Sequence, residues 1–169
     1  NARKAEEKLV QIINANFGAG DHLVTFSYAQ DKKPADMDRA KKDMRNYLAR
    51  LSRLCRRRGV PAPEYVYVTT NTHSNRWGTN YHHHMVLKVQ LARDEVESMW
   101  IKWHGICNTR IAQPNKEGLT GWAKYMADQP CSVAEEKRRE ADNRSPNAHR
   151  WAASKGLIIP QPTEADKKI

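Results

Sequence analysis

Apolar residues recur at two spacings along the chain, and these predict a succession of helices and strands. In the segment 36–57, Met44, Leu48 and Leu51 follow one another at intervals of three and four, the spacing of a buried helix face. In the segment 81–91, apolar and polar residues largely alternate, as on a strand buried from one side. We expect helices at 3–16, 36–57, 93–103, 119–128 and 132–142, and strands at 22–29, 64–70, 81–91 and 105–112.

The order of these elements predicts the fold class. After the first helix the order is strand, helix, strand, strand, helix, strand, and polar turns are expected at 71–80 and 114–118. This is the order of the split βαβ arrangement. We therefore expect an α+β, ferredoxin-like or RRM-like plait with a central antiparallel sheet and helices packed on one face. Residues 1–162 are expected to form a single domain, followed by a polar tail at 163–169.

Positive charge is concentrated in one segment. The 169 residues include 29 Lys and Arg against 19 Asp and Glu, a net charge of +10. Residues 32–58 alone hold eleven basic and three acidic side chains. A polyanion is the natural partner of such a segment, and Arg45 and Arg53 are candidate nucleic-acid contacts. The charge does not separate DNA from RNA, an acidic lipid surface or a merely solvated helix face.

Several classes of protein are disfavoured by composition. No stretch approaches 18 consecutive apolar residues, so no transmembrane helix is expected, and no signal peptide is visible. The three cysteines are far apart and form no CxxC pair, which argues against a disulfide framework or a cysteine zinc site. A reducing cytoplasm is the expected compartment. The sequence contains no phosphate-binding GxxxxGK[ST] string, so an attached helicase is not expected in this chain.

Three consecutive histidines give the most informative string, His82-His83-His84. Because successive strand residues face opposite sides, His82 and His84 share a face on which two imidazoles can bind one metal ion. His83 falls on the apolar face, towards the core. The alternative is that all three are ordinary exposed or packing histidines.

A tyrosine in the expected helix 119–128 is a candidate nucleophile. Tyr125 lies off the apolar stripe of that helix, to which Leu119, Ala123 and Met126 belong. A phenol with a pKa near ~10 attacks well only at a phosphate polarised by a nearby metal ion or cation. An ordinary amphipathic surface tyrosine is the alternative.

Four segments, taken in order, resemble one family of enzymes. They are Leu23 to Tyr28, His82 to His84, Trp100 to Gln113, and Gly121-Trp122-Ala123-Lys124-Tyr125. The set resembles the HUH endonucleases, and among them the single-tyrosine rolling-circle replication initiators of small phages and plasmids. Residues 150–157 resemble a trailing segment of the same group, and the likeness extends over about residues 20–162.

The resemblance implies a function. His82 and His84 would hold Mg²⁺ or Mn²⁺ at the scissile phosphate of single-stranded DNA, and Tyr125 would form a 5′-phosphotyrosine and release a 3′-hydroxyl. The implied partners are single-stranded DNA at a replication origin and host replication proteins, in the cytoplasm of the host cell. With one tyrosine, a second strand transfer needs a second subunit or a second engagement.

The chain departs from the family at the third metal ligand. The family has an acidic ligand at the end of the second strand, where this chain reads Val68-Thr69-Thr70-Asn71. Asn71, His73 or a water molecule are the candidates, and strand parity favours Asn71. Because hard divalent ions prefer carboxylate oxygens, the change is expected to weaken metal binding or favour Mn²⁺.

The chain also departs from the family pattern after Tyr125. The family often has a lysine three residues after the tyrosine, and this chain has Asp128 at that position. Lys88 and Lys124 are alternative sources of positive charge near the DNA. Arg76 and Trp77, in the polar stretch before the histidines, are candidates for stacking on an unpaired base.

Two other functions remain open: a DNA-binding plait without chemistry, and a transposase or relaxase with the same chemistry. A third alternative, an RNA-binding plait, is disfavoured by the histidines and Lys88 on the sheet.

Overall fold

The computed structural model describes residues 2–76, 78–129 and 151–161. Five helical segments are present in these ranges: α1 (Ala2–Asn16), the short 3₁₀ helix η1 (Gln30–Lys32), α2 (Met37–Arg58), α3 (Arg93–His104) and α4 (Thr120–Ala127). Five strands accompany them: β1 (His22–Tyr28), β2 (Glu64–Ser74), β3 (Gly78–Lys88), β4 (Gly105–Ile111) and β5 (Ala152–Ala153). The predicted helix at 132–142 lies outside the described residues.

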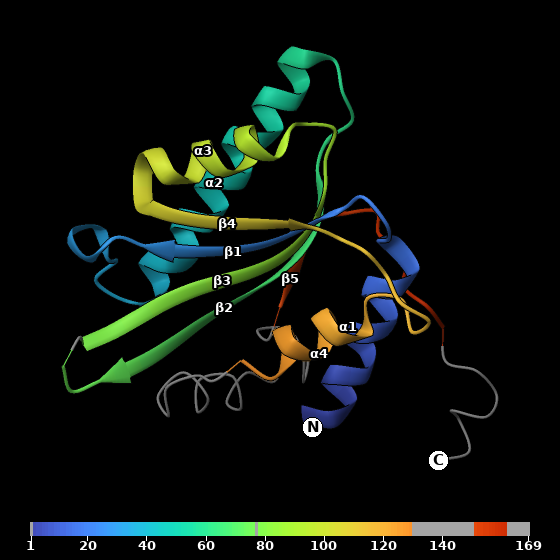
Figure 1. Ribbon diagram of the computed structural model, residues 1–169, viewed down its shortest axis with the longest axis horizontal. Helices are drawn as coiled ribbons and strands as arrows, with labels where there is room; N and C mark the ends of the chain where they lie inside the picture. Colours follow the sequence, from blue (N-terminus) through green and yellow to red (C-terminus); the bar gives the residue numbers. More distant parts are fainter. Residues whose placement is uncertain (1, 77, 130–150, 162–169) are drawn as a thin grey trace.

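The strands form one antiparallel sheet in the order β4-β1-β3-β2-β5 (Figure 1). The helices α2 and α3 make the two crossovers, from β1 to β2 and from β3 to β4, and β2 and β3 form a hairpin. This is the strand order of the split βαβ plait with a short fifth strand added at one edge. The predicted α+β class with a central antiparallel sheet is confirmed.

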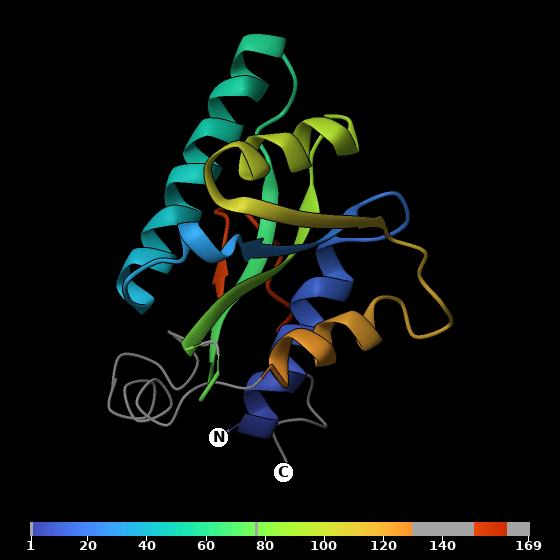
Figure 2. The same ribbon diagram turned by 60° about the vertical axis from the view of Figure 1, so that its left-hand side comes forward.

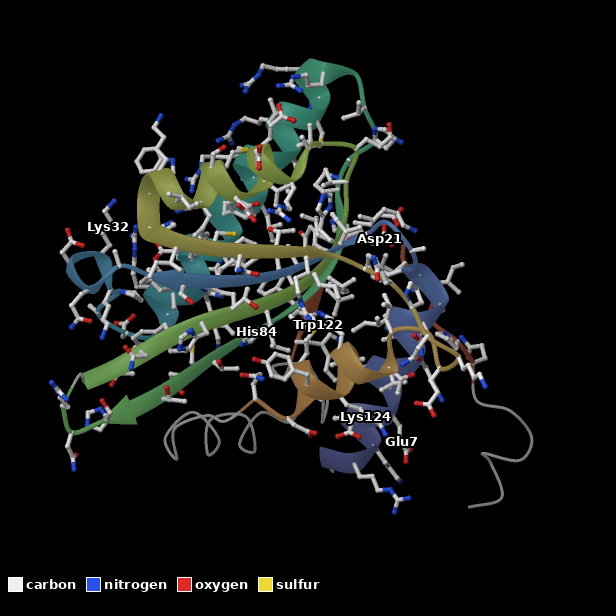
Figure 3. All side chains as sticks on the ribbon, viewed as in Figure 1. Glu7, Asp21, Lys32, His84, Trp122 and Lys124 are labelled. Carbon is white, nitrogen blue, oxygen red and sulfur yellow. The ribbon has the colours of Figure 1, made fainter. Side chains whose placement is uncertain are left out.

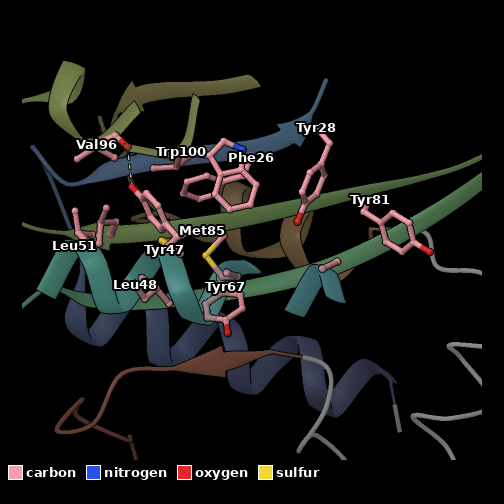
Figure 4. Close-up of a cluster of buried hydrophobic side chains, with 14 of the residues drawn as sticks. Phe26, Tyr28, Tyr47, Leu48, Leu51, Tyr67, Tyr81, Met85, Val96 and Trp100 are labelled. Atoms are coloured by element: carbon pink, nitrogen blue, oxygen red, sulfur yellow. Dashed lines mark hydrogen bonds between the residues drawn. The ribbon is translucent and has the colours of Figure 1, made fainter. Parts of the chain in front are cut away.

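One face of the sheet is covered by α2 and α3. Phe26 from β1, Met85 from β3 and Trp100 from α3 are fully buried there, together with Tyr47 from α2 (Figure 4). The Tyr47 hydroxyl donates a hydrogen bond of 2.8 Å to the carbonyl of Val96, which ties α2 to α3 inside the core. We call this the α2/α3 face.

The opposite face is covered in part by α1 and α4. Leu9 of α1 and Met126 of α4 pack there against Val66, Val68 and Val86 of the sheet. Figures 1 and 2 show the two helix pairs on opposite sides of the sheet. The expectation of helices on one face is therefore wrong, because these valines make an apolar patch on the second face that needs cover. We call this the α1/α4 face.

The hairpin of β2 and β3 is longer than the sequence predicts. Asn71 pairs with Tyr81, and pairing continues outward to Ser74 and Gly78, within the stretch expected to be a polar turn. The reason is that backbone pairing of a two-stranded ribbon does not require apolar side chains. Gly78 has a left-handed φ of 72°, which only glycine adopts without strain.

The long basic helix α2 has well-defined ends. The Asp36 side chain accepts a hydrogen bond of 2.8 Å from the backbone N–H of Arg39, and Gly59 adopts the left-handed conformation after the last turn. Three arginines in that last turn complement the negative end of the helix dipole. None of the helices in the described part of the chain is both long and apolar enough to cross a membrane.

Candidate active site

The histidine triplet lies in the middle of the sheet, on β3 between β1 and β2. His83 points into the α2/α3 core, where it is fully buried and its ring hydrogen-bonds both the Thr69 hydroxyl (2.8 Å) and the Tyr28 hydroxyl (3.1 Å). His82 and His84 therefore project from the α1/α4 face, as the alternation predicts.

Two hydroxyl groups on β1 orient these two histidines. Ser27 Oγ lies 3.1 Å from His82 Nδ1, and Thr25 Oγ1 lies 3.3 Å from His84 Nδ1. The two imidazole rings stand side by side with their centroids 6.4 Å apart. Hydrogen bonds at Nδ1 leave Nε2 of each ring as the nitrogen that could bind a metal ion, and a second partner usually orients a ligating histidine in this way.

Tyr125 lies beside His84, although 41 residues separate them in the chain. The rings are 5.2 Å apart between centroids and nearly perpendicular. The Tyr125 side chain is about half exposed, at 49%, whereas its neighbours Ala123 and Met126 on α4 are buried against the sheet. Tyr125 therefore lies off the buried stripe of α4, as the sequence predicts.

Trp122 packs between α4 and the histidines. Its ring lies 6.2 Å from that of His84 and 5.3 Å from that of Tyr125. Figure 3 shows Trp122 between α4 and the sheet close to His84, with Lys124 on the far side of α4 towards α1. Lys124 therefore does not extend towards the histidines.

Gln129 joins the site and was not expected from the sequence. Its Nε2 donates a hydrogen bond of 3.0 Å to the Tyr125 carbonyl, and its side chain is near enough to the His84 ring to raise the pKa of that ring, against the larger lowering by burial. One signal in the sequence could have found it: the helix was expected to run to residue 128, and a position four residues after Tyr125 falls one helical turn further on the same side.

Asn71 does not join the site. It pairs with Tyr81, so its side chain lies on the α2/α3 face together with His83. The prediction of Asn71 as the third metal ligand is therefore wrong. The odd-numbered residues of β2 project from the α2/α3 face, whereas His82 and His84 project from the α1/α4 face. Thr70 is the residue that pairs with His82 and shares its face.

The predicted DNA contacts are dispersed. Lys88 lies at the far end of β3, where its Nζ donates a hydrogen bond of 2.6 Å to the last carbonyl of α1, at Asn16. Arg45 and Arg53 are exposed on α2, across the sheet from the histidines, and Arg76 is exposed at the hairpin tip. Trp77 lies outside the described residues. None of these side chains is brought to His84 and Tyr125.

An open groove of about 400 Å³ begins at Tyr125 and runs between α4 and the edge strand β4. Its polar lining includes Thr25 on β1 and Asn108, Arg110 and Gln113 on or after β4. The Arg110 guanidinium stands over the Trp122 ring, 5.5 Å from its centroid. Cationic and amide side chains beside an aromatic ring are suited to a phosphodiester chain and its bases.

Burial keeps the histidines neutral. It lowers the pKa of His84 to about 4, with a further contribution from the charge of His82. Burial and the nearby Lys33 also lower the pKa of His82. Both rings therefore offer a lone pair at neutral pH, which metal binding requires.

The side chains that could hold a divalent cation at this site include no carboxylate. Within residues 2–76, 78–129 and 151–161, no group of three or more His, Cys, Asp or Glu side chains could hold a metal ion. Two imidazoles and the Gln129 amide are what the site offers. Two neutral rings supply nitrogen ligands, which suit a transition ion such as Mn²⁺ better than Mg²⁺, and the amide is a weaker ligand than the acidic residue of the resembled family.

No family model, curated protein or solved structure matches this chain.

The burial of His83 predicts how stability depends on pH. Burial lowers its pKa to about 3, whereas in the unfolded chain it returns to about 6.5. Between these values the unfolded state binds more protons, so the free energy of unfolding falls as the pH drops from about 6.5 towards 3. In urea titrations at a series of pH values, His83→Gln should flatten this dependence. The exposed control His73→Gln should not, and equal slopes for both variants would refute the assignment.

Proposed function

We propose that the protein is a metal-dependent endonuclease and strand transferase of single-stranded DNA, with Tyr125 as its nucleophile. The observation that carries the proposal is the 5.2 Å between the rings of Tyr125 and His84 on the face shared with His82. An exposed tyrosine beside two neutral histidines and a polar groove is a combination that core packing does not require. The order of motifs along the chain supports the same chemistry.

His82, His84 and Gln129 would hold the cation, which would polarise the scissile phosphate and orient it. The groove towards Arg110 and Gln113 would hold the DNA strand next to that phosphate. Arg110 would contribute a fixed positive charge, and Trp122 a ring face for an unpaired base.

In the chemical step, the Tyr125 oxygen forms a bond to phosphorus while the bond from phosphorus to the 3′ oxygen breaks. The phenol proton passes to solvent and the departing oxygen takes up a proton. A 5′-phosphotyrosine and a free 3′-hydroxyl result. Because no water enters the product, the 3′-hydroxyl can attack the phosphotyrosine and reseal the strand.

This chemistry suits the initiation of rolling-circle replication of a phage or plasmid in the cytoplasm of its host. A free 3′-hydroxyl primes synthesis by host replication proteins, and the phosphotyrosine preserves the strand for later closure. A transposase or relaxase would use the same step. The alternative of a DNA-binding plait without chemistry draws its support from the missing carboxylate ligand and from Asp128 in the place of a lysine.

Covalent capture tests the nucleophile. End-labelled single-stranded oligonucleotides, both a randomised pool and candidate origin strands, are incubated with the protein and Mn²⁺ and run on a denaturing gel. A protein–DNA band is expected that requires the cation and disappears in Tyr125→Phe. Tyr65→Phe, which removes a hydroxyl from the other face of the sheet, should retain the band. Salt-sensitive binding without any band would leave a binding module and exclude the endonuclease.

Variants of Gln129 test the third ligand. Gln129→Glu supplies a carboxylate and should tighten Mn²⁺ binding, measured by electron paramagnetic resonance of the free ion. Gln129→Ala should weaken it by roughly 10-fold or more. Gln90→Ala, at an exposed position beyond β3, serves as the control. Equal Mn²⁺ affinity in the Glu, Ala and unmodified proteins would remove Gln129 from the metal site.

A further inference from the structure

A second hollow lies next to the candidate site and is not used by the chemistry described above. It is a cavity of about 170 Å³ bounded by α1, β2, the end of α4 and Trp151. Thr70 and Gln129 line it, and these residues adjoin the site: Thr70 pairs with His82, and Gln129 donates a hydrogen bond to the carbonyl of Tyr125. Through these two residues the cavity adjoins the histidines and the tyrosine proposed to act on the scissile phosphate.

The walls of this cavity are apolar and aromatic. Leu9, Val68 and Met126 are buried side chains of the α1/α4 core, and the Trp151 ring packs at the edge of that core. A cavity of about 150 Å³ in another protein holds one benzene molecule. A space of this size and lining is suited to a single six-membered ring, and it is too small for two stacked bases.

The charged side chains at the cavity are of both signs. Glu6 of α1 and Asp128 after α4 line it close enough together for Asp128 to raise the pKa of Glu6, and Arg3, which pairs with Glu7, lines it as well. Two carboxyl groups repel a phosphate but accept hydrogen bonds from an amino group, as Asp and Glu do from the N4 amine of cytosine. The Thr70 hydroxyl and the Gln129 amide can donate to the ring acceptors N3 and O2. Thymine instead presents the acceptor O4 where cytosine presents its amine.

We propose that this cavity is a specificity pocket for an unpaired cytosine base next to the phosphate that Tyr125 attacks. The proposal rests on the proposed function, because it places the DNA strand across His84 and Tyr125. Enzymes that act on a nucleic-acid strand commonly read a base that has left the stack through its polar edge and an aromatic wall. The pocket would thereby select the position of the nick, while the groove at Arg110 holds the backbone.

A binding selection tests the pocket without requiring cleavage. Tyr125→Phe protein is mixed with a randomised single-stranded DNA pool in the absence of metal, and the bound strands are sequenced. Cytosine should be enriched at one fixed position of the selected motif, by about 5-fold or more over thymine. Adding Glu6→Lys replaces an acceptor with a donor, so the preference at that position should shift from cytosine towards thymine.

Glu117→Lys is the matched control, because it makes the same charge change at an exposed position outside the cavity lining. It should retain the cytosine preference. Glu6→Ala, at a half-buried helix position that favours alanine, should lose the preference without reversing it.

Three results would overturn the pocket: no bound strands, no base preference, or the same cytosine preference in both Glu6 variants. Failure of the proposed function has a different signature. If the selection finds cytosine and Glu6 controls it, but protein with Tyr125 forms no covalent product with Mn²⁺ on the selected strands, the pocket is retained and the endonuclease is excluded.

Discussion

The burial of His83 is the constraint on which the candidate site depends. Its ring is enclosed by the rings of Phe26, Tyr28 and Trp100, and both of its nitrogens have hydroxyl partners. A shift of β3 by one residue would expel this ring from the core and bury its two neighbours. The apolar face of the strand thus holds His82 and His84 on the other face, opposite the hydroxyl groups of β1.

The position of Tyr125 beside the histidines is set by the packing of α4 on the sheet rather than by the sheet itself. The valines on the α1/α4 face draw α4 onto the sheet, and Trp122 and Met126 seat it there. Tyr125 lies at the margin of that contact, where the covered part of the face gives way to the open groove. The exposed Tyr125, the buried His84, the half-buried His82 and the open groove all lie at this boundary between the covered and the uncovered sheet.

Much of this arrangement can be predicted from local patterns. The period-two alternation around the histidine triplet predicts which rings project together, and the three-four spacing predicts the helices that cover the core. The predictions that fail are those that depend on contacts between elements far apart in the sequence. Val66, Val68 and Val86 do not by themselves indicate that helices cover both faces. Parity within β2 places Asn71 with Tyr67 but does not say which face that is until the register with β3 is known. Gln129 lies two residues beyond the end of α4, so its nearness to His84 depends on how α4 packs on the sheet, which no local pattern predicts.

The central claim is that Tyr125 and the two histidines form one metal-dependent site, and ring-labelled tyrosine observed by NMR during a Mn²⁺ titration tests it most directly. The chain has six tyrosines, and the other five lie on β1, α2, β2 and β3 with side chains towards the α2/α3 core. Paramagnetic broadening should therefore remove the Tyr125 signal, assigned by its absence in Tyr125→Phe, at the lowest Mn²⁺ concentration. A Tyr125 signal that persists while the other tyrosines broaden first would contradict the account.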